Sequence, residues 1–485
     1  MEAFNTVLGH ISDFMYTYML VGLLMAAGIY FTIRTRGVQF RLFANMVSTI
    51  MKSRSVEGKG ISSFQAFAIG IASRVGTGNI VGVAIALAVG GPGAIFWMWV
   101  VALLGMATAF IEATLAQMFK VRGSDGSFRG GPAYYIHRGL GSRTWGLVFA
   151  VLLIFTFGFA FNMVQANTIA GVFEASFGVP SWGTALILVA LCAPIIMGGI
   201  RPVAKATEII APLMALIYVL IAIIIIGMNF SLIPAVFGAI FADAFGFWSA
   251  AGGLTGGFTA ALLNGVKRGL FSNEAGMGSA PNAAATATVS HPVQQGLIQS
   301  MGVFVDTVVI CSATAFICIV GGVYNVNQTD RDAAQTLTQD SIVNQLGGWT
   351  AIPVALIIFV FAYSSILGNY TYAEVNMDFI RGVGKPNYLL RALVVAAVAL
   401  GSIWAFSTVW ALADIAMGLM ALVNLVAIFA MGGWAIAALR DYERQLPEVK
   451  SGTANDFSFV GVDNPDLPKD MVNAVWDEEL GVTPS

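Results

Sequence analysis

Charged side chains are scarce in this sequence. Only 10% of its 485 residues are Asp, Glu, Lys or Arg, whereas 57% are hydrophobic. A soluble domain typically carries about 25% charged residues, so a soluble protein of this length is excluded. The composition instead predicts an all-α, polytopic membrane protein, because bilayer-spanning helices are apolar over about 20 residues.

Cysteine and histidine are also rare. Cys192, Cys311 and Cys318 all lie in apolar runs, where cysteine usually acts as a small packing residue. The three histidines are dispersed without an HExxH motif or a Cys/His ligand spacing, and Gly76-Thr77-Gly78 lacks the later glycine of a dinucleotide fingerprint. We therefore expect no enzymatic activity, no organic cofactor and no nucleic-acid partner.

Long apolar runs dominate the rest of the chain. The sequence predicts eleven transmembrane helices, two of them broken: 14–33, 61–90 (broken), 93–119, 145–173, 182–200, 207–228, 252–289 (broken), 295–323, 349–380, 389–406 and 409–439. The N-terminus lacks a charged segment and a cleavage site typical of a signal peptide, so the first run is predicted to remain as a span. An odd number of spans places the termini on opposite sides.

Basic residues crowd alternate loops, which predicts the orientation. The loop after the first span and the loop after the third span are the most basic, with six residues in one (Arg34, Arg36, Arg41, Lys52, Arg54, Lys59) and five in the other (Lys120, Arg122, Arg129, Arg138, Arg143). Because basic loops stay in the cytoplasm, the N-terminus is predicted outside and the C-terminus inside.

The composition changes after the last run. Residues 441–485 hold ten acidic and three basic side chains, and we expect them to form a mobile acidic cytoplasmic tail. The remaining chain divides into an additional first span with its basic loop (1–60) and two five-helix halves (61–230 and 231–440).

Each half opens with a broken run. The first is interrupted by Ser73-Arg74-Val75-Gly76-Thr77-Gly78-Asn79, and the second by the segment from Lys267 to Gly276. Backbone that leaves a helix at membrane depth persists only where it lines protein or a water-filled cavity. Interrupted segments at corresponding positions of two halves are typical of transporters with inverted repeats, so we predict a 5+5 inverted repeat with a solute site between the breaks.

The third helix of each half carries polar residues in an apolar run. They are Asn162 and Gln165 in one half, and Ser364, Ser365 and Asn369 in the other. We expect them to converge with the breaks on one cavity. The alternative is that they only bond neighbouring helices, as intramembrane Ser, Asn and Gln often do.

The breaks suit a solute with a carboxylate and an ammonium group. Free amides at the start of a half-helix, from Gly76 through Thr77 and Gly78 to Asn79, attract an anion. Sodium requires hard oxygen ligands, which we expect from the carbonyls of Ala72 and Val75 and the hydroxyls of Ser364 and Ser365. Asn79 and Asn273 have side-chain oxygens for the solute or a second ion, and Phe157, Phe161 and Phe271 either wall the cavity or pack in the core.

Charges at membrane depth must pair or face water. We predict that Glu274 pairs with Arg74 or Arg268, either as a latch that changes partner between states or as a static ion pair. Glu112 is either a proton-relay carboxylate or, more simply, the partner of a loop arginine.

Three motifs resemble one known family. The run from Gly90 to Trp99 (GGPGAIFWMW) with Gly105, the run GLFSNEAG from Gly269 with Gly278-Ser279-Ala280-Pro281, and GGPAYY from Gly130 are similar to signatures of the alanine or glycine:cation symporters, also called sodium:alanine symporters. This likeness covers roughly residues 15–440. The tail after Arg440 lies outside it.

The resemblance implies a leucine-transporter-like fold and sodium-coupled import of alanine or glycine, with D-alanine for some members and protons suggested as the coupling ion in others. It also implies a bacterial or archaeal cytoplasmic membrane. By position, Val75–Asn79 resembles the segment that holds substrate and ion, Gln165 a substrate contact, Phe271–Gly276 with Ser272 and Asn273 the second break, and Ser364-Ser365 the sodium-binding hydroxyls.

Asn369 falls where some relatives carry Trp, so the rim of the pocket is expected to differ.

Other functional classes are weaker candidates than a transporter. A channel lacks a pore-type loop, and an intramembrane enzyme would need a histidine near Ser272 and Glu274. The sequence does not choose between alanine, glycine and serine, between one sodium ion and two, or between oligomeric states.

Overall fold

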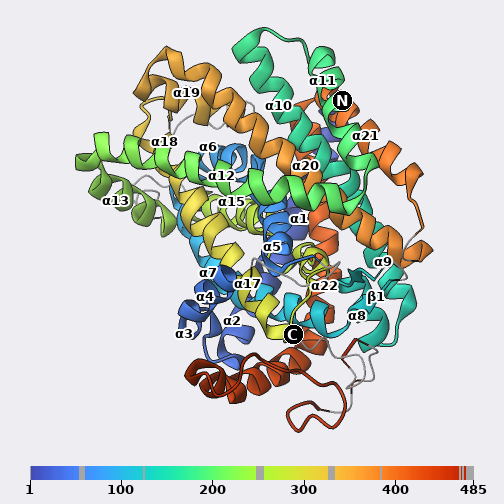
Figure 1. Ribbon diagram of the computed structural model, residues 1–485. Coiled ribbons are helices and arrows are strands. Elements are labelled where there is room, and N and C mark those ends of the chain that lie inside the picture. The colour runs from blue at the N-terminus through green and yellow to red at the C-terminus, as the bar shows by residue number, and fades with distance from the viewer. Residues whose placement is uncertain are drawn as a thin grey trace.

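The apolar runs fold into helices in the computed structural model, which describes residues 2–53, 61–123, 126–246, 256–325, 334–382, 385–468, 471 and 475–476 (Figure 1). Each of the eleven predicted runs contains a helix. Within the described residues, seven helices are long and apolar enough to cross a membrane, or eight if the bent pair Ser63–Arg74 and Gly78–Gly90 is one span. The protein is therefore a polytopic helical membrane protein.

The elements follow one another with few long connections. Those of the first part are α1 (Glu2–Met15), η1 (Tyr16–Leu20), α2 (Val21–Arg34), α3 (Val38–Arg41), α4 (Phe43–Lys52), α5 (Ser63–Arg74), η2 (Gly78–Gly82), α6 (Val83–Gly90), α7 (Gly93–Met118), β1 (Val121–Arg122), β2 (Phe128–Arg129), α8 (Pro132–Gly139), α9 (Arg143–Leu153), η3 (Ile154–Ala160), α10 (Phe161–Phe177), α11 (Ser181–Met197) and α12 (Ile200–Met228). Strands β1 and β2 form an antiparallel pair.

The second part continues with η4 (Phe230–Leu232), α13 (Ile233–Ala244), α15 (Gly256–Asn273), α16 (Ala280–Ala284), α17 (Pro292–Val303), η5 (Phe304–Cys311), α18 (Ser312–Val320), α19 (Ala334–Leu346), η6 (Gly348–Thr350), α20 (Ala351–Arg381), α21 (Tyr388–Ile403) and α22 (Phe406–Ser451). Segments η1, η2, η3 and η5 are π-helical turns, and all four continue directly into α-helices.

Two predicted spans form shorter helices. Helix α11 has 17 residues and α21 has 16, while residues 252–255 of the seventh predicted run lie outside the described residues. The count of eleven spans and the inverted repeat therefore stay predictions.

The first predicted break is confirmed, and the second is confirmed only from Glu274 onward, because residues 267–273, predicted to interrupt the helix, belong to α15. Helix α5 ends at Arg74, and the following helical segment Gly78–Gly90 is bent by 48° relative to it. Helix α15 ends at Asn273, and six residues separate it from the short helix α16. The far ends of the two broken segments also meet, since Ile61 and Ala287 form a parallel bridge.

The GGPG turn of the first motif packs against the end of α13. Gly91 has a positive φ of 72°, and the amide of Gly93 donates to Asp243 Oδ2 at 2.7 Å. A side chain at Gly93 would overlap the backbone of Ala244. The turn therefore needs glycine for close approach, and α13, which the sequence analysis did not predict, is the element that it contacts.

The expectation of a mobile tail is wrong for its described part. Helix α22 continues to Ser451, and the following chain lies across the end of the bundle that carries α3, α4 and α8 (Figure 1). Trp476 is 2% exposed and donates from Nε1 to the Gln117 carbonyl at 3.0 Å. Phe457 stacks on Tyr442 with ring centroids 4.1 Å apart. Aromatic burial thus offsets the high charge that favoured disorder.

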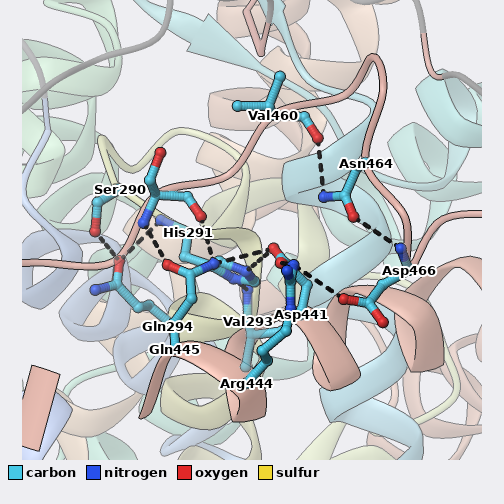
Figure 2. Close-up of polar contacts among 11 residues, drawn as sticks. Ser290, His291, Val293, Gln294, Asp441, Arg444, Gln445, Val460, Asn464 and Asp466 are labelled. Atoms are coloured by element: carbon cyan, nitrogen blue, oxygen red, sulfur yellow. Dashed lines mark hydrogen bonds and ion pairs between the residues drawn. The ribbon is translucent and has the colours of Figure 1, made fainter. Parts of the chain in front are cut away.

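A polar cluster joins the tail to the start of α17 (Figure 2). His291 Nε2 lies 3.1 Å from Asp441 Oδ2, and its Nδ1 accepts from the Val293 amide at 3.2 Å. Since Nδ1 accepts, the neutral ring carries its proton on Nε2. Arg444 bonds Asp441 and lies 3.1 Å from Asp466 of the tail.

Removing the Trp476 ring should release the tail. We expect Trp476→Ala to increase strongly the mobility of a nitroxide label at the exposed position Pro465, because loss of a buried Trp costs about 3–5 kcal/mol of packing. Trp404→Ala, which removes a tryptophan that is 45% exposed, is the control. Equal spectra for the Trp476→Ala variant and the unmutated tail would contradict the docked arrangement.

Acid should weaken the docking of the tail through the cluster of His291 and Asp441. Burial lowers the pKa of His291 from 6.5 more than Asp441 raises it, so the undocked state binds more protons once the pH falls below 6.5, and docking loses stability there. Label mobility at position 465 should therefore rise between about pH 6.5 and pH 5. His291→Gln should remove this dependence, and a pH-independent spectrum in the parent protein would count against it.

Candidate functional site

The first break directs two backbone amides at side chains. Val75 leaves the helical region with φ −80° and ψ 87°. The Gly76 amide then donates to Asn79 Oδ1 at 3.0 Å, and the Thr77 amide donates to Gln165 Oε1 at 3.1 Å. These amides have no helical acceptor, which is the arrangement that binds anions at the start of a helix. Gln165 thus meets the first break as predicted.

Hard oxygens also gather at this break. Ser365 Oγ donates to the Ala72 carbonyl at 2.8 Å and to the Phe361 carbonyl at 3.2 Å. A side chain at Gly76 would overlap Ser365 Oγ, so the break and α20 are in direct contact. One hydroxyl and two carbonyls fit the oxygen ligands that sodium requires.

Ser364 contacts this group only through the Phe361 carbonyl. Its hydroxyl donates to the Phe361 carbonyl at 2.8 Å and contacts Met214 Sδ of α12 at 3.3 Å. The structure therefore connects Ser365, rather than Ser364, to Ala72. The Phe361 carbonyl, which both serines contact, was not among the predicted ligands.

Aromatic rings cover the first break. Gly78 lies under Phe271, whose Cδ1 would be 2.8 Å from a Cβ at this glycine. Phe271 stacks on Phe161 with centroids 4.4 Å apart and packs against Trp410 at 4.8 Å. Phe157 lies one step away, against Phe161 at 4.6 Å. The rings form a continuous layer beside the amides.

The second break has a strained backbone. Glu274 adopts a positive φ of 58°, which is rare outside glycine, and its carboxylate accepts from Ser73 Oγ at 3.0 Å and Ser279 Oγ at 2.6 Å. Asn273 Oδ1 accepts from the Ala275 amide at 3.0 Å. The Asn273 side chain therefore replaces the helical acceptor of the Ala275 amide, and Ser73 ties the two breaks together.

Asn369 belongs to this network. It accepts from Ser73 Oγ at 2.8 Å and donates to Asn162 Oδ1 at 3.1 Å. The polar residues of the two third helices, predicted to converge, thus contact each other and the first break.

The prediction that Glu274 pairs with Arg268 is wrong. Arg268 forms its ion pair with Asp414 of α22 and lies 5.0 Å from the Trp410 ring centroid. Lys267 pairs with Asp13 of α1 at 2.6 Å. The sequence analysis did not consider these acidic partners, which lie in the additional first span and in α22. Arg74, the alternative partner, donates to the Gln299 carbonyl at 3.3 Å.

Glu112 contacts the second break and not a loop arginine. Its Oε2 accepts from the Gly276 amide at 3.1 Å, and Asn424 bonds both Glu112 and the Gly276 carbonyl. Gly276, with φ 89°, is therefore held by α7 and α22.

Sequence reasoning missed Asp306. This residue of η5 is 0% exposed, and its carboxylate accepts from Asn79 Nδ2 at 2.6 Å, Ser272 Oγ at 2.6 Å and Thr307 Oγ1 at 2.8 Å. The signal was present, because Asp306 is the sole charged residue of the run 295–323, and an intramembrane carboxylate is a candidate functional residue.

Known proteins are similar in sequence to this chain over most of its length. A model of the sodium:alanine symporter family matches residues 1–457. The chain belongs to the sodium:alanine symporter family. It is 47% identical over 442 residues to the amino-acid carrier protein AlsT of Bacillus subtilis, covering 91% of this chain and 93% of AlsT.

Two further relatives of the family are similar over comparable lengths. The probable sodium/glutamine symporter GlnT of Bacillus subtilis is 46% identical over 440 residues, 90% of this chain and 91% of GlnT. The sodium/alanine symporter AgcS of Methanococcus maripaludis is 37% identical over 448 residues, 90% of this chain and 97% of AgcS. Family membership and the helical structure together establish a membrane symporter of the alanine-carrier type.

Glycine at position 76 should be essential to the site. Gly76→Ala would force a methyl group into Ser365 Oγ and within 3.0 Å of Gln165 Oε1, so we expect alanine binding to fall at least about tenfold. In Gly82→Ala the nearest atom would be 3.7 Å away, and binding should persist. Binding by isothermal titration calorimetry is the readout, and equal affinities in the two variants would argue against the contact.

Proposed function

We propose that this protein is a sodium-coupled symporter that imports a small neutral amino acid by alternating access. Alanine and glycine are the leading substrates, with D-alanine and serine as further candidates. The observation that carries this proposal is the first break, where the Gly76 and Thr77 amides have no helical acceptor and Gln165 Oε1 and Ser365 Oγ both lie against Gly76. Two relatives support it by their names: AlsT is called an amino-acid carrier protein, and AgcS a sodium/alanine symporter.

The amides of Gly76 and Thr77 are suited to the substrate carboxylate. In the structure Asn79 Oδ1 and Gln165 Oε1 accept from them, so a carboxylate would exchange with these oxygens at little cost in hydrogen bonds. Gly78 lies on the same segment, and we assign it, with Ser272, Asn273, Gly276 and Asn369, to the wall and support of the substrate site.

The aromatic layer limits the size of the substrate. Phe271 already lies close to Gly78 and stacks on Phe161, which favours a short side chain. GlnT is named a probable sodium/glutamine symporter, so amino acids with a longer side chain, such as glutamine, are the competing substrate class. A panel of competing amino acids therefore decides the substrate better than the family name does.

Sodium would be held by neutral oxygens. Ala72 and Ser365 already meet at 2.8 Å, the Phe361 carbonyl adjoins them, and Val75 and Ser364 are the remaining proposed ligands. The ion supplies positive charge that neutral ligands do not compensate, so its binding favours the nearby substrate carboxylate. Ser365 connects α20 to the first break, and ion binding there would fix that contact.

The proposed membrane arrangement follows the sequence analysis. We infer a leucine-transporter-like fold with two inverted five-helix halves, in the bacterial or archaeal cytoplasmic membrane, with the N-terminus outside and the C-terminus cytoplasmic. Inverted repeats allow alternating access because one half moves against the other around a central site. The meeting of the two breaks at Asn79 and Ser272, 2.9 Å apart, supports this arrangement.

Proton coupling is the alternative for the same substrates, and a channel is a weaker one. Uptake of labelled alanine into proteoliposomes separates them. We expect accumulation with an inward sodium gradient. We expect none when choline replaces sodium, and none with a proton gradient alone. Accumulation driven by protons without sodium would favour the alternative, and single-channel conductance would favour a channel.

Gln165 tests the substrate site. Gln165→Ala removes the amide side chain assigned as a substrate contact and should lower sodium-driven alanine uptake by more than about tenfold, because a buried polar group of the bound substrate loses its hydrogen-bond partner. Gln345→Ala is the matched control, since Gln345 bonds the Val320 carbonyl of α18, away from the breaks. Undiminished uptake by the Gln165→Ala protein would refute this assignment.

A further inference from the structure

We propose that the docked tail restrains the opening of the transporter on its cytoplasmic side, by holding together the ends of the two broken segments. This inference rests on the alternating access of the proposed function, which places these ends where the substrate would leave. The tail here means the part described after α22, residues 452–468, 471 and 475–476.

The two broken segments meet at a backbone junction. Ile61, at the start of the first segment, forms a parallel bridge with Ala287 of the second, and the Thr288 amide donates to the Ile61 carbonyl at 3.0 Å. The next residue, Ser62, caps α5 by accepting from the Gln65 amide at 3.0 Å. The start of α5 is therefore fixed to the chain that follows α16, and the two segments separate here only if this junction opens.

The end of α7 holds the junction. Gln117 Nε2 donates to the Ala287 carbonyl at 3.1 Å and also bonds the Ala284 carbonyl. Lys120, two residues after the end of α7, donates from Nζ to the same Ala287 carbonyl at 3.0 Å. Both side chains are buried. Two donors thus converge on one carbonyl of the junction, and their positions decide whether it stays closed.

The tail contacts both of these donors through one side chain. Trp476 Nε1 donates to the Gln117 carbonyl at 3.0 Å, and the centroid of the Trp476 ring lies 4.9 Å from Lys120 Nζ. The ring of Phe128 in β2 lies 4.1 Å from the same ammonium group. Aromatic rings attract a cation more strongly when it is removed from water. Trp476 therefore stabilises Lys120 in the position that bonds Ala287.

Trp476 is fixed within the tail by backbone and ring contacts. The Gly461 amide donates to the Trp476 carbonyl at 3.0 Å, and the Gly461 carbonyl accepts from the Met471 amide at 2.8 Å. The ring of Phe459 lies with its centroid 5.3 Å from that of Trp476 and 5.1 Å from that of His291, the residue that caps α17. The tail therefore joins the end of α7 to the start of α17.

The restraining segment extends past the region shared with the family. The sodium:alanine symporter model matches residues 1–457, so Phe459, Gly461 and Trp476 lie beyond it. Gln117 and Lys120, which Trp476 covers, lie within it. The tail is therefore an addition to the matched region, and it contacts that region where the two broken segments meet.

The energetic consequence follows from preferential binding. A segment that binds one conformation better than another shifts the equilibrium toward the first. The contacts of Trp476 are made with Gln117 and Lys120 while these residues bond Ala287, so they favour the closed junction. In transporters with inverted repeats one half moves against the other around the central site, and an undocked tail would leave the junction freer to open.

A cysteine at the start of α5 reports this opening. Ser63 is the first residue of α5 and is 7% exposed, so Ser63→Cys should react slowly with a fluorescent maleimide while the junction is closed. The rate is measured on the full-length protein in nanodiscs without alanine. We expect Trp476→Ala to raise it at least about fivefold, because small free-energy changes shift such equilibria by this factor. Trp404→Ala, at an exposed position, is the control and should leave the rate unchanged.

The native cysteines distinguish junction opening from general unfolding. All three are buried and should stay unlabelled in these variants (Cys192, Cys311 and Cys318). If Trp476→Ala exposes them, Gln445→Ala takes its place. Gln445 of α22 donates to the Ser458 carbonyl at 2.7 Å and accepts from the Ser458 amide at 2.8 Å, so its loss should loosen the tail and raise the rate at least about twofold.

Two results would overturn the restraint. One is an unchanged labelling rate of Ser63→Cys in both Trp476→Ala and Gln445→Ala. The other is an equal increase in Trp404→Ala, which would show that the rate does not depend on the tail.

The test is separable from the proposed function. Failure of the wild-type protein to accumulate alanine with sodium would refute sodium-driven alanine import, whereas the labelling of Ser63→Cys requires neither substrate nor ion gradient. Conversely, normal sodium-driven uptake together with unchanged labelling in the tail variants would refute only the restraint by the tail.

Discussion

The hydrogen bonds of Asn79 are the contact on which the site depends. Breaking a helix inside a membrane leaves backbone amides that lipid cannot satisfy. Asn79 Oδ1 accepts from the Gly76 amide, and Nδ2 donates to Ser272 and Asp306 beyond it. One side chain therefore stabilises the first break and connects it to the second, and the oxygens proposed to bind sodium lie beside the same Gly76.

The surrounding helices hold the breaks from outside. Glu112 and Asn424 fix Gly276, Ser73 and Ser279 fix Glu274, and Arg268 pairs with Asp414 beside the aromatic layer. Each contact replaces a helical hydrogen bond or compensates a buried charge. The same contacts are the ones that must change if the halves move, so the network is both the support of the site and the candidate for its conformational control.

Much of this site was predictable from the sequence, because glycine and polar residues are conspicuous in apolar runs. The breaks at Gly76 and Glu274 and the contact of Gln165 with Thr77 were found in this way. Asp306 and the partner of Arg268 were missed, since pairing depends on which helices pack together. The tail was misjudged because its charge outweighed three aromatic residues, Phe457, Phe459 and Trp476, that are buried only in the folded protein.

The most direct test of a shared site at the breaks is an experimental structure with alanine and sodium bound. We expect the alanine carboxylate within hydrogen-bond distance of the Gly76 and Thr77 amides, with its methyl group against Phe271, and a sodium ion at the Ala72 and Ser365 oxygens. Alanine bound away from both breaks, or these amides still paired with Asn79 and Gln165 in the bound state, would contradict the account.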